Sequence, residues 1–416
     1  MRLSWSAVIG SQVARNALLA FSGQFLSRIL GVVITVILFR AYPPEVMGIY
    51  GLMLSYLSLG ILAQQLGHNQ ALVRLTIEGR SSEIERVIFY RLTISVLCIL
   101  VGVGGITCQT SSPFAPFGNE ALLLVLVLLC NALSFDWQIR ADQRFGALAM
   151  ITVQGQVVSL FFAGLGWLSG SLLVLVLVQL GFSLCLTLGC TIAVGRQRFF
   201  EIVTGAIRHA VRPMVPLKLV LHSNVGYSVL TFVAILLSNF EMLLGGLFLS
   251  PKELGDLSAI TRLGMIAFAF QSALMDVIYS NILASGQDRG KVNVWLNLVI
   301  GGLAMAIILV MPETIVHILF GSAFLHLRHE VQIYAVSLLS SSCFNIVLLS
   351  AYLRAVEIGE RGGSILYLLL GFAGITGVGV WFVAQYGLDG IIVFTTLKWM
   401  VMAGVLYMCF RRSPHL

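Results

Sequence analysis

The chemistry open to this chain depends on a few charged side chains inside long apolar stretches that could cross a membrane. Three are cations and two are carboxylates: Arg28, Arg262, Lys398, Glu241 and Asp276. A charged side chain at bilayer depth is costly in free energy, so each is a functional candidate. The cations could bind an anionic substrate, because the planar donors of guanidinium contact two phosphate oxygens at once. The carboxylates could carry a coupling proton or sodium ion.

Arg28 lies near the middle of the first apolar stretch, and Gln24 precedes it by one helical turn on the same face. We predict that Arg28 and Gln24 line a central cavity and bind a pyrophosphate or an acidic sugar there. The alternative for Arg28 is an internal ion pair, or a side chain that reaches to the membrane interface.

Arg262 and Asp276 are 14 residues apart on one predicted helix, so they share a face but cannot pair directly. Arg262 is predicted to be a second cavity cation. The alternative is that its side chain extends to the outer membrane interface. Lys398 is either a cavity cation or the partner of Glu241 or Asp276. Glu241, close to Asn239, is the leading candidate for ion coupling, and a structural salt bridge is its alternative. Asp276 has the same two roles open to it.

The apolar segments that must position these side chains fill most of the chain. Hydrophobic residues make up 58% of the 416 residues, charged residues 10%, and the mean hydropathy is +0.96. A membrane span needs roughly 20 apolar residues and must be helical unless it closes a barrel. We predict an all-α polytopic membrane protein with spans near 18–39, 46–66, 87–107, 119–138, 146–167, 170–193, 220–248, 256–282, 292–312, 330–353, 364–384 and 387–410. No connection is long enough for a soluble catalytic domain.

The positions of Lys and Arg predict the orientation of these spans, because basic residues favour cytoplasmic loops. With the N-terminus inside, 18 of the 25 basic residues fall in cytoplasmic segments and three, Arg40, Lys252 and Arg328, fall outside. The other four lie within spans. Both termini are therefore predicted to be cytoplasmic. The net charge of +7 is explained by this bias, with anionic lipid headgroups as a secondary partner and no nucleic acid.

Short motifs repeat about half a chain apart. Pro44 and Gly48 lie at the start of the second span, and Pro251 and Gly255 lie just before the eighth. Pro44 corresponds to Pro251 and Gly48 to Gly255, each with a shift of 207 positions. Phe117-Gly118 and Phe320-Gly321 repeat with a shift of 203. These echoes and the even number of spans favour a duplicated, pseudo-symmetric pair of six-helix bundles around a central cavity, a common transporter plan. The predicted organisation is an N-terminal bundle over 1–194, a cytoplasmic linker over 195–218 and a C-terminal bundle over 219–416.

Three motifs carry a resemblance to a known family. They are Phe39 to Tyr50 (FRAYPPEVMGIY) with Asn16 ahead of the first span, Gly67 to Arg74 (GHNQALVR), and Phe135-Asp136-Trp137 with the basic turn Arg140 to Arg144. By these motifs and its topology, the chain resembles the polysaccharide-biosynthesis flippases, the Wzx-like group for O-antigen and exopolysaccharide repeat units. Their superfamily also includes MATE multidrug transporters and lipid II flippases.

The resemblance implies a flippase of the bacterial inner membrane, with an undecaprenyl-diphosphate-linked oligosaccharide as substrate. It also implies membrane lipids as partners, and a polysaccharide polymerase and chain-length proteins as candidate partners. A drug or cation antiporter is the alternative within the superfamily. A membrane glycosyltransferase or polymerase is disfavoured, because the longest outer loop, near residues 312–329, has few catalytic groups. No phosphate-loop motif and no C-x-x-C is present, so we expect no cofactor, no metal and no enzyme activity.

Overall fold

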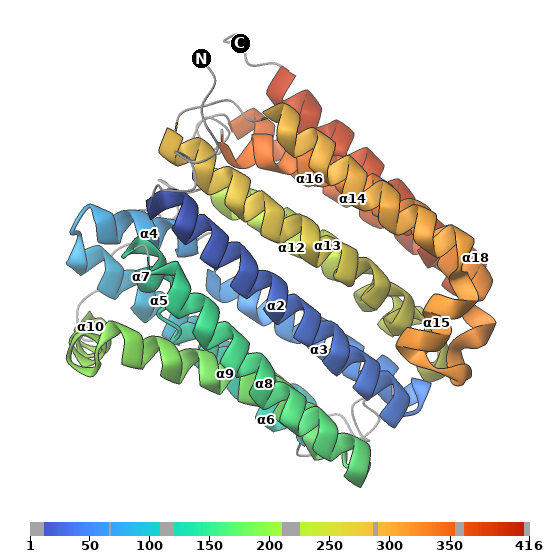
Figure 1. Ribbon diagram of the computed structural model, residues 1–416, viewed down its shortest axis with the longest axis horizontal. Coiled ribbons are helices and arrows are strands. Elements are labelled where there is room, and N and C mark those ends of the chain that lie inside the picture. Colours follow the sequence, from blue (N-terminus) through green and yellow to red (C-terminus); the bar gives the residue numbers. More distant parts are fainter. Residues whose placement is uncertain are drawn as a thin grey trace. The chain divides into compact units, whose positions relative to one another are not determined.

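The protein is helical wherever its structure is described. The computed structural model describes residues 12–65, 68–108, 120–142, 144–209, 225–285, 290–353 and 362–411, and no strand occurs in these ranges. Seven of their helices are long and apolar enough to cross a membrane, or eight if a bent pair is one span. The chain is therefore an all-α, multi-pass membrane protein, as predicted (Figure 1).

Contacts within the chain define two compact units. Unit 1 comprises residues 1–34 and 63–220, and unit 2 comprises residues 35–62 and 221–416. Helices α2 (Gln12–Ala41) and α3 (Pro44–Gln65) are shared, because each has one end in unit 1 and the other in unit 2. Residues 35–62 belong to unit 2, whereas the sequence prediction placed them in the N-terminal bundle.

Unit 1 also contains three long spans and several shorter helices. Its members are α4 (His68–Ile77), α5 (Ser81–Cys108), α6 (Glu120–Ala132), α7 (Asp136–Ala141), α8 (Phe145–Ser169), α9 (Leu172–Val194) and α10 (Arg196–His209). The predicted fourth span is interrupted between α6 and α7, where Phe135 and Trp137 are fully buried and Phe135 packs 5.0 Å from the ring of Phe199. The Phe-Asp-Trp motif thus anchors one end of this unit. Helix α10 occupies residues 196–209 of the predicted linker, and residues 210–218 lie outside the described ranges.

Unit 2 contains the remaining helices. They are α12 (Val225–Phe248), α13 (Pro251–Ser285), α14 (Gly290–Val310), α15 (Pro312–Phe320), the 3₁₀ helix η2 (Ser322–Leu327), α16 (Arg328–Leu353) and α18 (Gly362–Arg411). The chain turns by 97° between α14 and α15. Helix α18 carries the last two predicted spans, which meet at Gly387, where φ is 57°. A left-handed φ breaks the helix at that point and favours glycine there.

A buried glutamine occupies the same register in both halves of the chain. In unit 1, Gln64 Nε2 donates to Ser95 Oγ at 2.7 Å and to the carbonyl oxygen of Leu128 at 3.0 Å. In unit 2, Gln271 Nε2 donates to Ser342 Oγ at 2.6 Å, and Gln271 Oε1 accepts from Asn345 at 2.8 Å.

Gln64 and Gln271 are 207 positions apart, the shift that also relates the two proline–glycine motifs. Each glutamine joins the second helix of its half to other helices of that half, which is the usual role of amides among membrane helices. The hydrogen bonds therefore support a duplication. The second repeated motif includes Phe117-Gly118, which lies outside the described residues.

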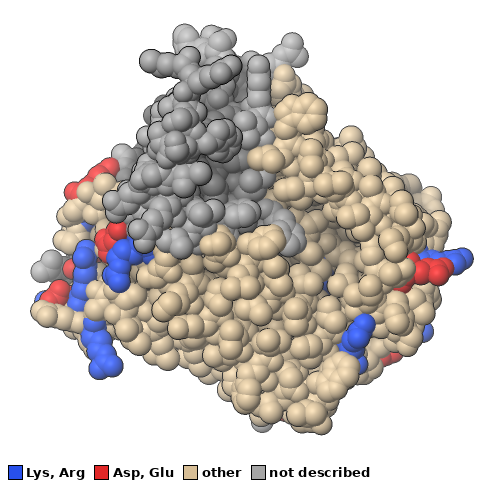
Figure 2. Space-filling model, in the orientation of Figure 1, with Lys and Arg blue, Asp and Glu red and all other residues tan. Residues whose placement is uncertain are grey.

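Charged side chains are sparse over the middle of the described surface. On the face drawn in Figure 2, blue and red atoms gather at the left and right margins, and the described surface between them is almost entirely tan. The exposed side chains of the described residues include large apolar ones such as Trp295 and Trp381, at 70% and 53% exposure. An apolar surface of this kind suits contact with lipid rather than water.

Replacing Gln271 with leucine should lower the free energy of unfolding by about 1–2 kcal/mol, because both interhelical hydrogen bonds are lost from a buried site. The midpoint of unfolding of the purified protein in detergent measures this. Gln197→Leu on the exposed face of α10 is the control, with a change within about 0.5 kcal/mol. Equal midpoints for the two variants would contradict a stabilising role of Gln271.

Candidate functional site

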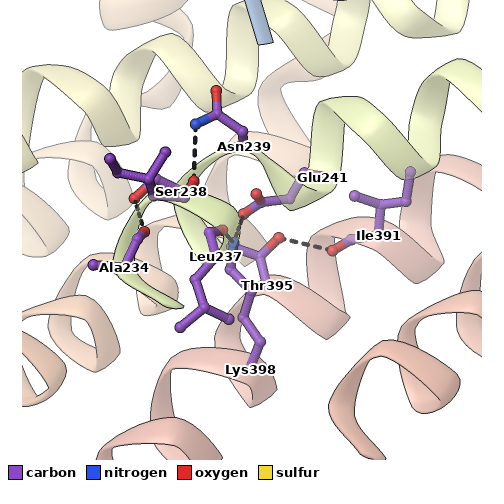
Figure 3. Close-up of polar contacts among 9 residues, drawn as sticks. Ala234, Leu237, Ser238, Asn239, Glu241, Ile391, Thr395 and Lys398 are labelled. Atoms are coloured by element: carbon purple, nitrogen blue, oxygen red, sulfur yellow. Dashed lines mark hydrogen bonds and ion pairs between the residues drawn. The ribbon is translucent and has the colours of Figure 1, made fainter. Parts of the chain in front are cut away.

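A buried ion pair between α12 and α18 is the most unusual polar feature of unit 2. Lys398 Nζ pairs with Glu241 Oε1 and also donates a hydrogen bond to the backbone carbonyl of Leu237 (Figure 3). The lysine is 0% exposed and the glutamate 4% exposed. Glu241 and Lys398 are thus each other's partners, one of the two alternatives that the sequence left open for Lys398.

Helical spacing explains how this pair is held. Leu237 precedes Glu241 by four residues on α12, so its carbonyl and the glutamate carboxylate lie on one face, toward Lys398. On α18, Thr395 lies one turn before Lys398 and donates its hydroxyl to the carbonyl of Ile391 at 2.9 Å. Both charges are therefore fixed by regular helix rather than by a loop.

Aromatic rings exclude water around the lysine. The ammonium of Lys398 lies 4.6 Å from the centroid of the Trp399 ring, and the ring of Phe344 is 4.9 Å from that of Trp399. A cation beside an aromatic face gains a further electrostatic attraction, which is larger where water is absent. In apolar surroundings the attraction between Lys398 and Glu241 is strong, but so is the cost of separating them.

A tyrosine from a third helix completes the surroundings of the glutamate. Tyr334 of α16 is 6% exposed, hydrogen-bonds Ser337 and lies close enough to Glu241 to interact electrostatically. Gly264 of α13 makes room for this ring, since a Cβ there would approach Tyr334 Cζ to 2.9 Å. Sequence reasoning missed Tyr334, because a tyrosine in an apolar helix gives no signal of its own.

Arg262 occupies a different part of unit 2. It is half-buried on α13, donates to Met265 Sδ at 3.8 Å and interacts electrostatically with the buried Tyr50 of α3. Its guanidinium is thus held at the side of α13 that faces α3. The described contacts include no carboxylate partner for it.

Arg28 lies on the part of α2 that belongs to unit 1. Its side chain is exposed, whereas the neighbouring Ser27 is 6% exposed. Gln24 and Asp276 have helical backbones in α2 and α13, but their side chains lie outside the described residues. Among the predicted site residues of unit 2 whose side chains are described, the structure pairs Glu241 with Lys398 and places Arg262 apart from them.

Arg91 is a second buried cation. The sequence placed it within a span but assigned it no role. Arg91 of α5 is 1% exposed and interacts electrostatically with Asp136, which also accepts from Arg140 Nε at 3.1 Å. Its position within a predicted span was the feature of the sequence that could have identified it as a structural or functional charge. Because Asp136 begins the short helix α7, this charge cluster stabilises the packing of unit 1 where the fourth span is broken.

The described helices and the buried charges define a multi-pass membrane protein, and the comparisons place it in a family. The model of the polysaccharide biosynthesis protein family matches residues 13–279, more than half of the chain. The chain belongs to this family. Among curated protein sequences, none matches the chain.

Solved structures of the same fold are transporters and a flippase. A multidrug resistance MATE family transporter of the MOP superfamily, in an inward-facing conformation, has a TM-score of 0.69 with 13% identity, covering 95% of this chain and 99% of that one. A mutant of the MATE transporter VcmN from Vibrio cholerae has a TM-score of 0.62 with 12% identity, covering 98% and 97%. The lipid II flippase MurJ, in an inward closed conformation, has a TM-score of 0.59 with 14% identity, covering 95% and 87%. The predicted family is confirmed by the family model, and the all-helical membrane fold that this chain shares with MATE transporters is confirmed by the structural matches.

Replacing Lys398 with methionine should lower the free energy of unfolding by about 3–5 kcal/mol, because Glu241 is left buried without a counter-charge. The double variant Lys398→Met with Glu241→Met should recover most of that loss, since an apolar replacement of a buried pair is often neutral. Denaturation of the purified protein in detergent measures both.

Lys252→Met, at an exposed position, is the matched control and should leave stability unchanged. If the double variant is as unstable as Lys398→Met alone, the ion pair is not the cause of the loss.

Proposed function

We propose that this protein is a flippase that moves oligosaccharide repeat units, linked to undecaprenyl diphosphate, from the cytoplasmic to the periplasmic leaflet. The family match over residues 13–279 carries the proposal, because the family's description names polysaccharide biosynthesis. The lipid II flippase among the structural matches supports it, since its name joins this fold to flipping of a lipid. The two bundles would alternately open their central cavity to either side of the membrane.

Arg28 and Arg262 are the proposed contacts to the diphosphate or to an acidic sugar. Arg28 supports this role because its guanidinium is exposed although it lies in the first span. Arg262 supports it because its described neighbours, Tyr50 and Met265, leave its charge uncompensated by a carboxylate. Gln24, one turn from Arg28, is proposed to add a hydrogen bond to the same substrate group. The lipid tail would stay in the bilayer.

Glu241 and Lys398 are the proposed coupling pair. The pair is neutral as it stands, and a proton added to Glu241 would leave the ammonium of Lys398 buried without a counter-charge. Removing one partner of a buried pair costs about 3–5 kcal/mol, so the protonated state would favour an anion at Lys398. We propose that the substrate phosphate is that anion. The proton returns to water when the phosphate leaves and the pair re-forms, and Asp276 is the second candidate for carrying a coupling ion.

The membrane potential would add direction to this exchange. Moving one elementary charge across a membrane potential of 100 mV changes its free energy by about 2.3 kcal/mol. A negative interior favours outward movement of an anionic lipid headgroup, which is the direction that the proposed function requires. In this scheme the proton on Glu241 is bound and released together with the phosphate, so it moves outward with the headgroup and reduces by one the negative charge that crosses. A polymerase and chain-length proteins would then use the exported repeat unit, for an O-antigen or exopolysaccharide.

A drug or cation antiporter is the second candidate, because most of the structural matches named above are MATE transporters. Such a transporter needs carboxylates that are free to bind a cation. Here the buried Glu241 is already paired with Lys398, a cation of the chain itself. The pair therefore favours an anionic substrate over a cationic one.

In a strain that lacks this gene and any redundant flippase, lipid-linked repeat units should accumulate on the cytoplasmic leaflet and surface glycan should be lost. The wild-type gene should restore the glycan, Arg28→Ala should not, and Arg28→Lys should restore part of it because it keeps the charge but loses the bidentate geometry. Immunoblots of surface glycan and of membrane-inserted protein measure this.

Arg80→Ala, at an exposed arginine outside the spans, is the control and should export normally. Normal glycan with Arg28→Ala would remove this residue from the site. Repeat units that still reach the periplasm in the deletion strain would refute the function itself.

In proteoliposomes that hold the purified protein and a lipid-linked oligosaccharide, a pH gradient that is acidic on the side from which the substrate moves should stimulate flipping several-fold. Glu241→Gln should abolish the response to the gradient, because the amide mimics a permanently protonated carboxyl group, while some flipping without a gradient remains. Asp276→Asn tests the second candidate, and Glu313→Gln, at an exposed residue of α15, is the control. Full stimulation of Glu241→Gln would exclude this residue from coupling.

A further inference from the structure

A pocket of about 600 Å³ opens on the surface of unit 1, between α5 and α10. Helix α5 contributes Glu85 to its lining, and one side of α10 contributes Gln197, Phe200, Glu201, Thr204 and Arg208. A volume of this size is typical of sites for small ligands. The lining combines two carboxylates, one guanidinium and one aromatic ring, so the pocket can contact a ligand that has groups of both signs.

The polar side chains of the pocket follow the helical repeat of α10. Gln197, Glu201, Thr204 and Arg208 are separated by four, three and four residues, so they form a stripe along one face of the helix. The opposite face packs against the hydrophobic core of unit 1 through Phe199, Ile202, Val203 and Ala206. This packing fixes the rotation of α10 about its axis and keeps the polar stripe at the surface.

A glycine in α10 lets a carboxylate of α5 reach the pocket. A Cβ atom added to Gly205 would collide with the carboxylate of Glu85, so this carboxylate lies directly against the backbone of α10. The carboxylate of Glu201 is oriented by Gln197, whose Nε2 donates to its Oε1 at 3.1 Å. The two carboxylates therefore belong to one pocket, although they come from helices far apart in the sequence.

Hydrogen bonds within α10 determine which groups a ligand must bring. The hydroxyl of Thr204 already donates to the carbonyl oxygen of Phe200, and the amide of Gln197 donates to Glu201. The Thr204 oxygen and the carboxylates can therefore accept further hydrogen bonds, whereas the guanidinium of Arg208 can only donate. A matching ligand has a cationic N–H donor a short distance from an anionic acceptor.

The pocket lies where the chain leaves a membrane span. Gly195, with φ of 97°, is the single residue between α9 and α10, so α10 begins at the end of the span (Figure 1). Arg196 and Arg198 at this point predict a cytoplasmic location, because basic residues favour that side. The start of α10 is therefore at the level of the lipid headgroups.

Large apolar side chains border the pocket. Phe200, which lines it, and Ile207, seven residues later on the same side of α10, are 63% and 56% exposed. Near the end of α9, Leu188 and Ile192 are exposed as well. Apolar side chains that are exposed at a membrane surface contact the acyl chains of lipids. The pocket thus joins charges of both signs to an apolar border.

We propose that this pocket binds the headgroup of a zwitterionic phospholipid with a primary ammonium group, phosphatidylethanolamine. The ammonium contacts Glu85 and Glu201, the phosphate contacts Arg208, and the acyl chains lie along Phe200 and Ile207. An anionic headgroup without an amine would meet two carboxylates and is disfavoured. The site uses none of the residues proposed for substrate binding or ion coupling, so the inference is independent of the proposed function.

A bound lipid of this kind would join α10 to α5. Its ammonium would bridge a carboxylate of each helix, Glu85 of α5 and Glu201 of α10, and so compensate two like charges that share one pocket. The lipid would therefore be a retained component of the protein, distinct from the lipid that is transported.

The first experiment needs no variant. Native mass spectrometry of the purified full-length protein in detergent measures its affinity for dioleoyl lipids that are added one at a time. Successive N-methylation of phosphatidylethanolamine removes the three N–H donors but keeps the charge, so affinity should fall at each step and be at least tenfold lower for phosphatidylcholine. Phosphatidylglycerol should also bind at least tenfold more weakly.

Two results of this experiment would overturn the proposal. The first is equal affinity for phosphatidylethanolamine and phosphatidylcholine, and the second is tighter binding of phosphatidylglycerol, which would indicate attraction of anionic lipid by the basic residues alone. Glycerophosphoethanolamine has the same headgroup without acyl chains and should bind at least a hundredfold more weakly. An affinity equal to that of the intact lipid would show that a soluble molecule, not a lipid, is the ligand.

The second experiment locates the lipid with variants at exposed positions. Glu201→Gln and Arg208→Gln should each lower the affinity for phosphatidylethanolamine at least tenfold, and Thr204→Trp should do the same without a change of charge, because its indole fills the pocket. Arg198→Gln and Glu313→Gln are the matched controls outside the pocket and should bind like the wild type. Unchanged affinity in the three pocket variants, or an equal loss in the controls, overturns the site.

Discussion

The low dielectric of the membrane interior is the constraint on which this structure depends. It forces every span to be helical, and it penalises any charge that lacks a partner. Glu241 and Lys398 satisfy the second condition by pairing across α12 and α18, with the Leu237 carbonyl as a third group. The constraint that makes the pair stable also makes it responsive, because one added proton unbalances it.

The same constraint decides how amides are used. Gln64 and Gln271 are fully buried, and their hydrogen bonds join helices inside their own halves. The amides and the charges therefore have different roles. The amides hold the helices of each half together, whereas the ion pair and the exposed Arg28 are the groups that would change partners in the proposed transport cycle. Under the proposed transport cycle, this division would separate the groups that stabilise each half from the groups that bind the substrate.

Sequence predicted most of the fold, because a span must be long, apolar and helical. It left Lys398 as either a cavity cation or the partner of Glu241 or Asp276, because the register of helices far apart in the chain is set by packing. The interruption before Asp136, the 97° turn before α15 and the ring of Tyr334 also escaped prediction. Each depends on contacts between helices, and none alters the hydropathy of the chain.

The two repeated proline–glycine motifs pack on each other, because a Cβ atom added to Gly48 would lie 2.8 Å from the carbonyl oxygen of Pro251 and one added to Gly255 would collide with that of Pro44. This self-complementary packing has an evolutionary consequence. Before duplication, a half-length ancestor that paired with its own copy would have met itself at this point, and one glycine codon would have served both sides. After gene fusion the two codons were free to diverge. Glycine occupies both positions in this chain, whereas the equivalent Gly51 and Ser258 are different residues of small size.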